Sequence, residues 1–340
     1  MFFLKFLIHS LIVLNILNIG STFQQKRNVM NNEFEPAYLK LHRSGELKKR
    51  GEELMDKLKS CNLCPRACLA KRTEGKKGFC QAPDKLMISS YGPHYGEERP
   101  LVGKGGSGTI FFTHCALRCV FCINWDISHL GKGTIVTIEE LANIMLYLQK
   151  IGCHNINLVT PDHYLPHIIL AIDMAAAKGL KLPIVYNTCG WINIDVLQKL
   201  DGIVDIYLPD FKYADEKMAI KYSAGARDYP EITKKALLEM HKQVGVAKPQ
   251  KDGLIYKGLM IRHLVMPNHV ENSKQVLKWI AENLPKDTYV NIMSQYTPVY
   301  KAKEYPEIAR PITREEYYEV VNYAKQLGLT NLDIQGYRFW

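Results

Sequence analysis

Residues 108–122, GTIFFTHCALRCVFC, join an apolar strand-like run to three cysteines. Cys115, Cys119 and Cys122 have the spacing C-x3-C-x2-C. Thiolates are preferred ligands of zinc, copper(I) and iron–sulfur centres. A [4Fe–4S] cluster normally takes four cysteines, so a triplet leaves one coordination position open for another molecule. The stretch therefore predicts a metal centre with an open position at the end of a buried strand.

The chain after this stretch alternates apolar runs with amphipathic helical patterns. Near-continuous apolar strands separated by such helices are typical of βαβ units and of a parallel sheet covered on both faces. We therefore expect an α/β fold, a partial or full (β/α) barrel whose strand ends carry the chemistry. The strand-like runs are 108–114, 155–160, 183–188, 203–211, 259–266 and 289–294, and the helical patterns are 137–152, 165–180, 193–200, 230–245 and 272–284.

A small cysteine-rich appendage precedes this core. Residues 36–60 have the apolar spacing of one amphipathic helix, and 91–108 are rich in glycine and proline, which favours a linker. Between them, four cysteines with the spacing C-x2-C-x3-C-x11-C can close a tetrahedral zinc site or hold an auxiliary iron–sulfur cluster. The spacing leaves both metals open. The four are Cys61, Cys64, Cys68 and Cys80.

The first residues resemble a leader. An apolar run of about 14 residues is shorter than a membrane span. Our hypothesis is that translation begins at Met30 and that residues 1–29 are a mis-assigned leader; export or membrane tethering is the alternative. The predicted organisation is then an appendage at 30–91 and a core barrel with a C-terminal extension at 92–340. Nine cysteines, an odd number, argue against a disulfide framework and for a reducing, cytoplasmic compartment.

The net charge of +10 has part of its excess between Lys40 and Lys77. Without interleaved aromatic residues, such a stretch favours a solvated helix face over a nucleic-acid surface. We also expect no membrane partner. Cys153 and Cys189 have no close cysteine partner in the sequence, which is typical of buried or strand-end thiols.

The cysteine triplet, with Phe121 before its last member, resembles the signature of the radical S-adenosylmethionine (SAM) superfamily. The resemblance runs from about Gly92 to Arg314 and is similar in detail to the subgroup of pyruvate formate-lyase activating enzymes. That subgroup usually has Gln-Asn after the last cysteine, where this chain has Ile123-Asn124. The matching stretches are GSGTIFFTHCALRCVFC, NINLVTPDHYLP, PIVYNTCGW, DIYLPDFKY, IRHLVMP and NIMSQYTP.

The resemblance implies an iron–sulfur oxidoreductase in which the triplet binds a [4Fe–4S] cluster. The open iron would bind S-adenosylmethionine, whose reductive cleavage gives a 5′-deoxyadenosyl radical that abstracts a hydrogen atom from the substrate. It also implies a flavodoxin- or ferredoxin-like one-electron donor and a glycyl-radical protein as substrate. The residues that it places near the cofactors are Phe121, Asn187, Thr188, Asp210, Lys212 and Arg262.

Other functions remain open from the sequence. A radical SAM core can instead modify a small molecule or another macromolecule. From different classes, the chain could be a non-catalytic iron–sulfur electron carrier or a zinc-dependent nucleic-acid-binding protein. A carrier needs neither an open iron nor polar strand ends, and the affinity of a nucleic-acid module should fall steeply with salt.

Overall fold

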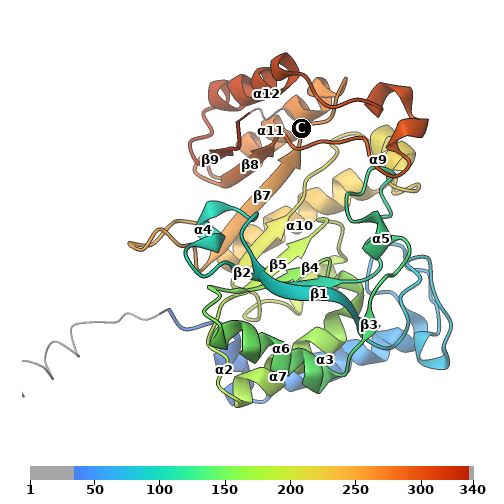
Figure 1. Cartoon of the computed structure of the whole chain (residues 1–340), viewed down its shortest axis with the longest axis vertical. Helices are drawn as coiled ribbons and strands as arrows, with labels where there is room; N and C mark the ends of the chain where they lie inside the picture. Colours follow the sequence, from blue (N-terminus) through green and yellow to red (C-terminus); the bar gives the residue numbers. More distant parts are fainter. Residues whose placement is uncertain (1–33, 337–340) are drawn as a thin grey trace, which may run out of the picture. The chain divides into compact units, whose positions relative to one another are not determined.

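The computed structural model describes residues 34–336, so the hypotheses on residues 1–29 lie outside the described residues. The described residues from Pro36 onward form one compact unit. In its described part, strands run through the middle and helices cover them (Figure 1). None of the helices between residues 34 and 336 combines the length and the apolar character that a bilayer crossing requires.

A nine-stranded sheet with the order β3-β1-β2-β4-β5-β6-β7-β8-β9 forms the core. Neighbouring strands from β2 to β9 are parallel, and β1 is antiparallel to both β2 and β3. In the described residues β3 and β9 remain the two edges, so the barrel is partial. The predicted α/β class and partial barrel are confirmed. The strands are β1 (Met87–His94), β2 (Ser107–Phe112), β3 (Thr134–Ile135), β4 (Ile156–Val159), β5 (Ile184–Thr188), β6 (Ile206–Pro209), β7 (Gly258–Leu264), β8 (Tyr289–Met293) and β9 (Leu332–Ile334).

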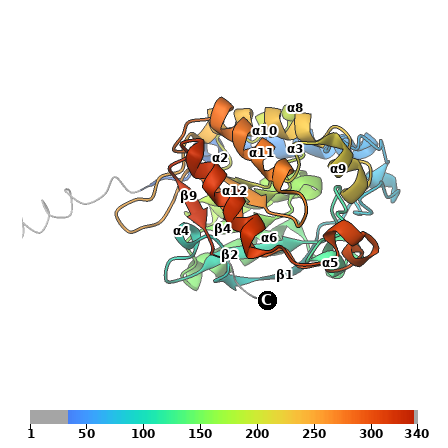
Figure 2. The same cartoon turned by 90° about the horizontal axis from the view of Figure 1, so that it is seen from above.

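Helices lie outside the strands, with α6 and α7 near β2 and β4 and with α11 and α12 near β8 and β9 (Figures 1 and 2). Helix α6 shows why these segments are helical: Thr137 and Glu140 form a capping box at its start. The helices are α2 (Tyr38–Arg43), α3 (Glu46–Asp56), α4 (Arg99–Val102), α5 (Trp125–Ser128), α6 (Ile138–Lys150), α7 (Leu165–Ala177), α8 (Ile194–Gln198), α9 (Glu216–Tyr222), α10 (Tyr229–Val244), α11 (Val270–Asn283) and α12 (Arg314–Gln326).

The single helix predicted over residues 36–60 was wrong. Helix α2 ends before Ser44, and Gly45 has a φ of 76°, which is outside the helical region. Helix α3 then begins at Glu46 and packs against α7, where a Cβ on Gly51 would lie 2.8 Å from Leu170. The short glycine turn therefore redirects the chain so that α3 reaches its partner helix.

The linker predicted over residues 91–108 was also wrong. This stretch contains the second half of β1, helix α4 and the start of β2. The apolar pattern is weak because Ile88 alone is buried in β1, whereas four of its eight residues are exposed. Antiparallel pairing with β2 fixes the strand in spite of its composition.

The appendage is fastened to the barrel by a buried arginine. The guanidinium of Arg72, 1% exposed, donates to the carbonyl oxygen of Pro83 at 2.5 Å and to that of His163 at 2.7 Å. His163 follows β4, so the bond joins the cysteine-rich segment to the core sheet. A buried charge of this kind is tolerated because the carbonyl oxygens satisfy its donors.

Candidate functional site

A cavity of about 490 Å³ opens at the carboxyl ends of the parallel strands. This position follows from the fold, since parallel strands end at the same edge of the sheet and bring their last residues together. Its size is that of a pocket for a cofactor or a small ligand. Residues at or just after the strand ends line it: Phe112, Thr160, Thr188, Asp210, Leu264 and Met293.

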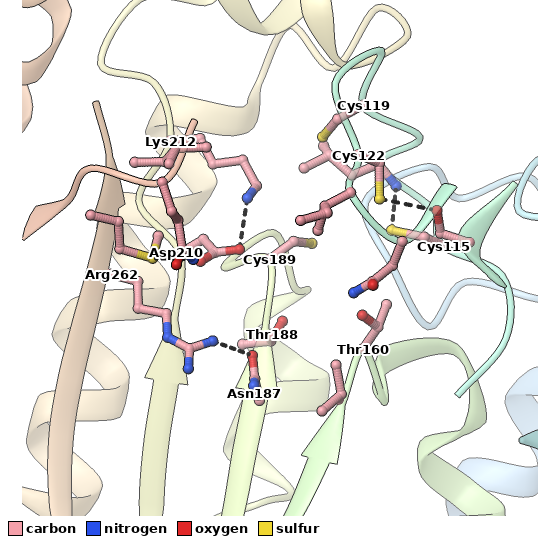
Figure 3. A pocket seen from close by; sticks show the side chains of 18 of the residues that line it. Cys115, Cys119, Cys122, Thr160, Asn187, Thr188, Cys189, Asp210, Lys212 and Arg262 are labelled. Carbon is pink, nitrogen blue, oxygen red and sulfur yellow. Dashed lines mark hydrogen bonds and ion pairs between the residues drawn. The ribbon is translucent and has the colours of Figure 1, made fainter. Parts of the chain in front are cut away.

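The three thiols of Cys115, Cys119 and Cys122 all line this cavity (Figure 3). The sulfur of Cys119 lies 3.1 Å from the hydroxyl of Ser223, and that of Cys122 lies 3.2 Å from the hydroxyl of Ser128. These two thiols each contact a serine hydroxyl.

The pKa of Cys115 is lowered, whereas the pKa values of the other two thiols are raised. A hydrogen bond from the Cys189 thiol, the largest influence, lowers the pKa of Cys115 to about 7. Burial instead raises the pKa of Cys119 to about 12. Cys189 is a strand-end thiol, as the sequence predicted, since it follows β5 directly, and its hydrogen bond to Cys115 is a contact that the sequence did not indicate.

Asp210 and Lys212 form an ion pair of 2.7 Å beside the cysteines (Figure 3). Burial alone would lower the pKa of Lys212, but the carboxylate of Asp210 and the thiol of Cys119 outweigh it and raise that pKa. Lys212 therefore carries its positive charge inside the cavity. That charge acts on Cys119 in the direction that favours the thiolate.

Arg262 lies on β7 at the other end of the cavity. Its Nε donates to Glu98 Oε1 at 2.6 Å and its Nη2 donates to Glu98 Oε2 at 2.7 Å, while Glu97 also pairs with Nη2. Burial would raise the pKa of Glu98, but the guanidinium outweighs it and holds that pKa below its usual value. Arg262 Nη1 further donates to Asn187 Oδ1 at 3.3 Å (Figure 3).

The remaining predicted residues also line the cavity. The ring of Phe121, 7% exposed, lies 5.9 Å from that of Tyr296. The hydroxyl of Thr188 donates to Asp162 Oδ1 at 2.8 Å, so this hydroxyl is already engaged. All six residues that the resemblance assigned to cofactor binding therefore stand around one cavity with the triplet, and their roles stay predictions. They are Phe121, Asn187, Thr188, Asp210, Lys212 and Arg262.

The four cysteines of the appendage do not line the cavity. Cys61, Cys64 and Cys80 are buried and Cys68 is exposed. They lie near enough to affect one another: Cys61 and Cys68 act to raise the pKa of Cys80, and Cys61 and Cys80 act to raise that of Cys64. In the described part of the chain, no three or more His, Cys, Asp or Glu side chains are already grouped to hold a metal ion.

Comparison with known proteins decides the family. The profile described as the Radical SAM superfamily matches residues 109–294, more than half of the chain, and this range contains the triplet and five of the parallel strands besides most of β2. The chain belongs to the radical SAM superfamily. This family typically uses a [4Fe–4S] cluster and S-adenosylmethionine, and the chain is accordingly a radical SAM enzyme.

The relatives of this radical SAM chain include two uncharacterized proteins of Methanocaldococcus jannaschii. One is 32% identical over 279 residues, covering 80% of this chain and 76% of that protein. The other is 24% identical over 294 residues, covering 78% of this chain and 80% of that protein. Among solved structures, methylornithine synthase (PylB) matches with a TM-score of 0.45 and 16% identity, covering 65% of this chain and 61% of that one.

The residues of the site fit the cofactors of the radical SAM superfamily. Three thiols from one loop face one cavity, and thiolates are the protein ligands that iron–sulfur clusters take. The ammonium of Lys212 offsets the negative charge of such a thiolate set. Polar side chains at the far end can meet the polar groups of a nucleoside.

Sequence reasoning missed Glu97, Glu98 and Cys189 as residues of the site. The two glutamates lie in the stretch predicted as a linker, and no local pattern joins them to Arg262, which is 164 residues from Glu98. Cys189 had a usable signal, because it directly follows Asn187 and Thr188 at the end of a predicted strand.

Proposed function

We propose that this radical SAM enzyme cleaves S-adenosylmethionine reductively in the cavity at the strand ends and uses the product to remove a hydrogen atom from a partner protein, as pyruvate formate-lyase activating enzymes do. The observation that carries the first part is that the three thiols and the polar ends of the parallel strands face one cavity of about 490 Å³. The second part rests on the motif resemblance.

Cys115, Cys119 and Cys122 would hold three irons of a [4Fe–4S] cluster. When bound, the cluster and S-adenosylmethionine supply one-electron cleavage of the sulfonium and the radical that takes the hydrogen atom. Phe121 packs at the cysteine loop and keeps water from it. Its ring is nearly buried and contacts Tyr296 from the segment after β8.

The charged pairs of the cavity orient the bound nucleoside, and Lys212 and Arg262 stay protonated in them. Lys212 stays protonated beside Asp210 and stabilises negative charge at the thiols. Arg262 is fixed by Glu97 and Glu98, so its remaining donors point in one direction toward Asn187. Side chains fixed before the ligand binds lose less freedom on binding.

A protein substrate is supported by the rim of the cavity. Ile123, which is 72% exposed, and the exposed Asn124, Gln295 and Thr297 line the cavity at its surface. A glycine-bearing segment of another chain can therefore reach the reacting atoms. The electron would come from a flavodoxin- or ferredoxin-like donor.

The four cysteines of the appendage are proposed to bind a second metal, either zinc or an auxiliary iron–sulfur cluster. Three of them are buried, and all four belong to one segment of 20 residues, 61–80. Thiolate sets of this size suit both metals. Zinc, iron and sulfide analysis of the wild type and of Cys61→Ser distinguishes them: loss of zinc indicates the first, loss of iron with sulfide the second.

The test of the proposed function is anaerobic turnover. Wild-type protein reconstituted with iron and sulfide should release 5′-deoxyadenosine from S-adenosylmethionine in the presence of dithionite. Cys119→Ala should abolish the product, whereas Cys153→Ala, which removes a buried thiol outside the cavity, should not. If the wild type forms no 5′-deoxyadenosine, the proposal is wrong. A glycyl-radical signal on an added partner protein tests the substrate class separately.

A further inference from the structure

One arginine of the appendage, Arg66, reaches the cysteine triplet. Its Nε donates to the carbonyl oxygen of Ala116 at 3.0 Å, within the loop between the first two cysteines of the triplet. Its Nη1 and Nη2 donate to the carbonyl oxygens of Ala224 at 2.9 Å and of Ser223 at 3.1 Å. All three nitrogens of the guanidinium are therefore bonded to two separate loops of the site, which a planar fork of donors can do and a lysine cannot.

Two aromatic rings hold the guanidinium in this position. Its central carbon lies 4.0 Å from the ring centre of Phe79 and 4.8 Å from that of Trp191. Phe79 belongs to the appendage, and Trp191 follows β5 two residues after Cys189. Cation–π contacts of this kind stabilise an arginine that burial has partly removed from water.

Two of the carbonyl groups that Arg66 binds, those of Ser223 and Ala224, belong to a turn that supports the triplet. Besides its contact with Cys119, the hydroxyl of Ser223 lies 2.9 Å from that of Tyr213. The backbone N–H of Val120 donates to the carbonyl oxygen of the preceding Tyr222 at 2.9 Å. The turn therefore holds the loop at two adjacent positions.

The same turn contains a strained residue. Ala224 has a φ of 49°, a left-handed conformation that is unfavourable for a non-glycine residue unless its surroundings hold it. The bond from Arg66 Nη1 to its carbonyl oxygen is one of the contacts that hold it. Removing the guanidinium therefore favours relaxation of the turn and, with it, movement of Ser223.

Arg66 also belongs to the second cysteine set. It lies two residues after Cys64, whose thiol receives a hydrogen bond from the backbone N–H of Arg66. One residue thus contacts a cysteine of the appendage through its backbone and the triplet loop through its side chain. Arg50, like Arg66 and Arg72, is an appendage arginine that donates to core carbonyl groups, and its partners, those of Lys199 and Asp201, lie outside the cavity.

We propose that Arg66 is a positioning residue through which the segment 61–80 holds the loop of Cys115, Cys119 and Cys122 in the conformation that binds the cluster. Its positive charge beside these thiols also favours the reduced, more negative state of the centre. The proposal rests on the proposed function only for the identity of that centre.

The first test uses the metal-free protein and needs no cluster. Alkylation of Cys119 by iodoacetamide, followed by mass spectrometry, reports how firmly the Ser223 turn covers this thiol. Arg66→Ala should increase the rate about tenfold, the factor that corresponds to loss of one charge-assisted hydrogen bond. Arg50→Ala, the matched control, should leave the rate unchanged. Equal rates in wild type, Arg66→Ala and Arg50→Ala would overturn the proposal.

The second test uses reconstituted protein. The electron paramagnetic resonance signal that responds to S-adenosylmethionine should be about tenfold weaker in Arg66→Ala, and the midpoint potential of the remaining signal should be more negative. Arg66→Lys should recover the potential, because it keeps the charge, but not the full signal. Full recovery of both, or a wild-type potential in Arg66→Ala, would contradict the proposal.

A third variant decides the matter if Arg66→Ala does not fold. Phe79→Ala removes an exposed ring and loosens the guanidinium without deleting it. It should raise the alkylation rate of Cys119 by a smaller factor than the arginine variant, and an unchanged rate would count against the proposal. A wild type that binds no cluster but shows the alkylation pattern would refute the proposed function and leave the role of Arg66 standing.

Discussion

Replacing Arg262 by methionine should destabilise the protein in a pH-dependent way. The substitution keeps an unbranched apolar side chain but leaves two carboxylates, Glu97 and Glu98, without their cation. Glu98 is 4% exposed and loses both of its bonds to the guanidinium, while it keeps the one from Asn291 Nδ2 at 2.8 Å. Breaking a buried pair of this kind costs about 3–5 kcal/mol, because an uncompensated charge stays buried. We expect the upper half of that range, since two carboxylates are affected.

The dependence on pH follows from the pKa of Glu98. In the wild type Arg262 holds this pKa low, so the pair stabilises the fold above about pH 4.3, the unfolded value, and loses this contribution as pH falls through the folded pKa. In the variant, the guanidinium no longer outweighs burial, which raises the pKa of Glu98 above the unfolded value. The deficit should therefore be largest near neutral pH and shrink as pH falls toward the unfolded pKa and Glu98 takes up a proton.

Urea unfolding of the metal-free protein, followed by circular dichroism at about pH 7.5 and about pH 5, measures this deficit. Lys178→Met is the control, because Lys178 pairs with Glu139 on the surface at 3.2 Å and its loss should cost roughly 0–1 kcal/mol at both pH values. An equal deficit for Arg262→Met at the two pH values, or a deficit no larger than that of the control, would refute this reasoning.

Three further variants test other parts of the structure by the same urea method. Gly190→Ala should cost about 2 kcal/mol or more, because Gly190 has a φ of 78° and the new Cβ would lie 2.4 Å from the backbone oxygen of Asp210; a neutral effect would mean that this turn is not as described. Burial raises the pKa of Asp162 to about 6, so the wild type should lose about 2–3 kcal/mol of stability as pH rises from about 4 to about 6, and Asp162→Asn should lack this loss; parallel pH profiles would contradict this. Thr137→Ala breaks the capping box with Glu140 and should cost about 1 kcal/mol, and a change below a few tenths would show that the cap contributes little.

The parallel strands were predictable because their burial leaves a continuous apolar run. In β6, all four residues from Ile206 to Pro209 are apolar and buried, and such a run is visible without any knowledge of the fold. Strand β9 is short and partly exposed, so its residues resemble a loop. Pairing with β8 fixes it, and pairing is a property of distant segments that local composition does not record.

The cavity was predictable to the extent that parallel strands end together. The resemblance placed Asp210 and Lys212 near the cofactors, and the structure brings both to the cavity that the triplet lines. The contacts that tune the site were not predictable, because they join segments far apart in the chain. The hydrogen bond of Cys189 to Cys115 and the contacts of Arg66 with Ala116 are of this kind.

The break at Gly45 is a different case. Its single glycine was visible in the sequence, but an isolated glycine is tolerated within helices at a cost of about 1 kcal/mol. Tertiary packing decides between a continuous and a broken helix. Here the packing of α3 on α7 favours the break.

The most direct test of the account is whether one iron of the cluster at Cys115, Cys119 and Cys122 is open to S-adenosylmethionine. Electron paramagnetic resonance of the reduced, reconstituted protein should show a [4Fe–4S] signal whose g-values shift when S-adenosylmethionine is added, and Cys119→Ala should lack the shift. A cluster signal that is unchanged by S-adenosylmethionine, or no cluster at all in oxygen-free wild-type protein, would contradict the account.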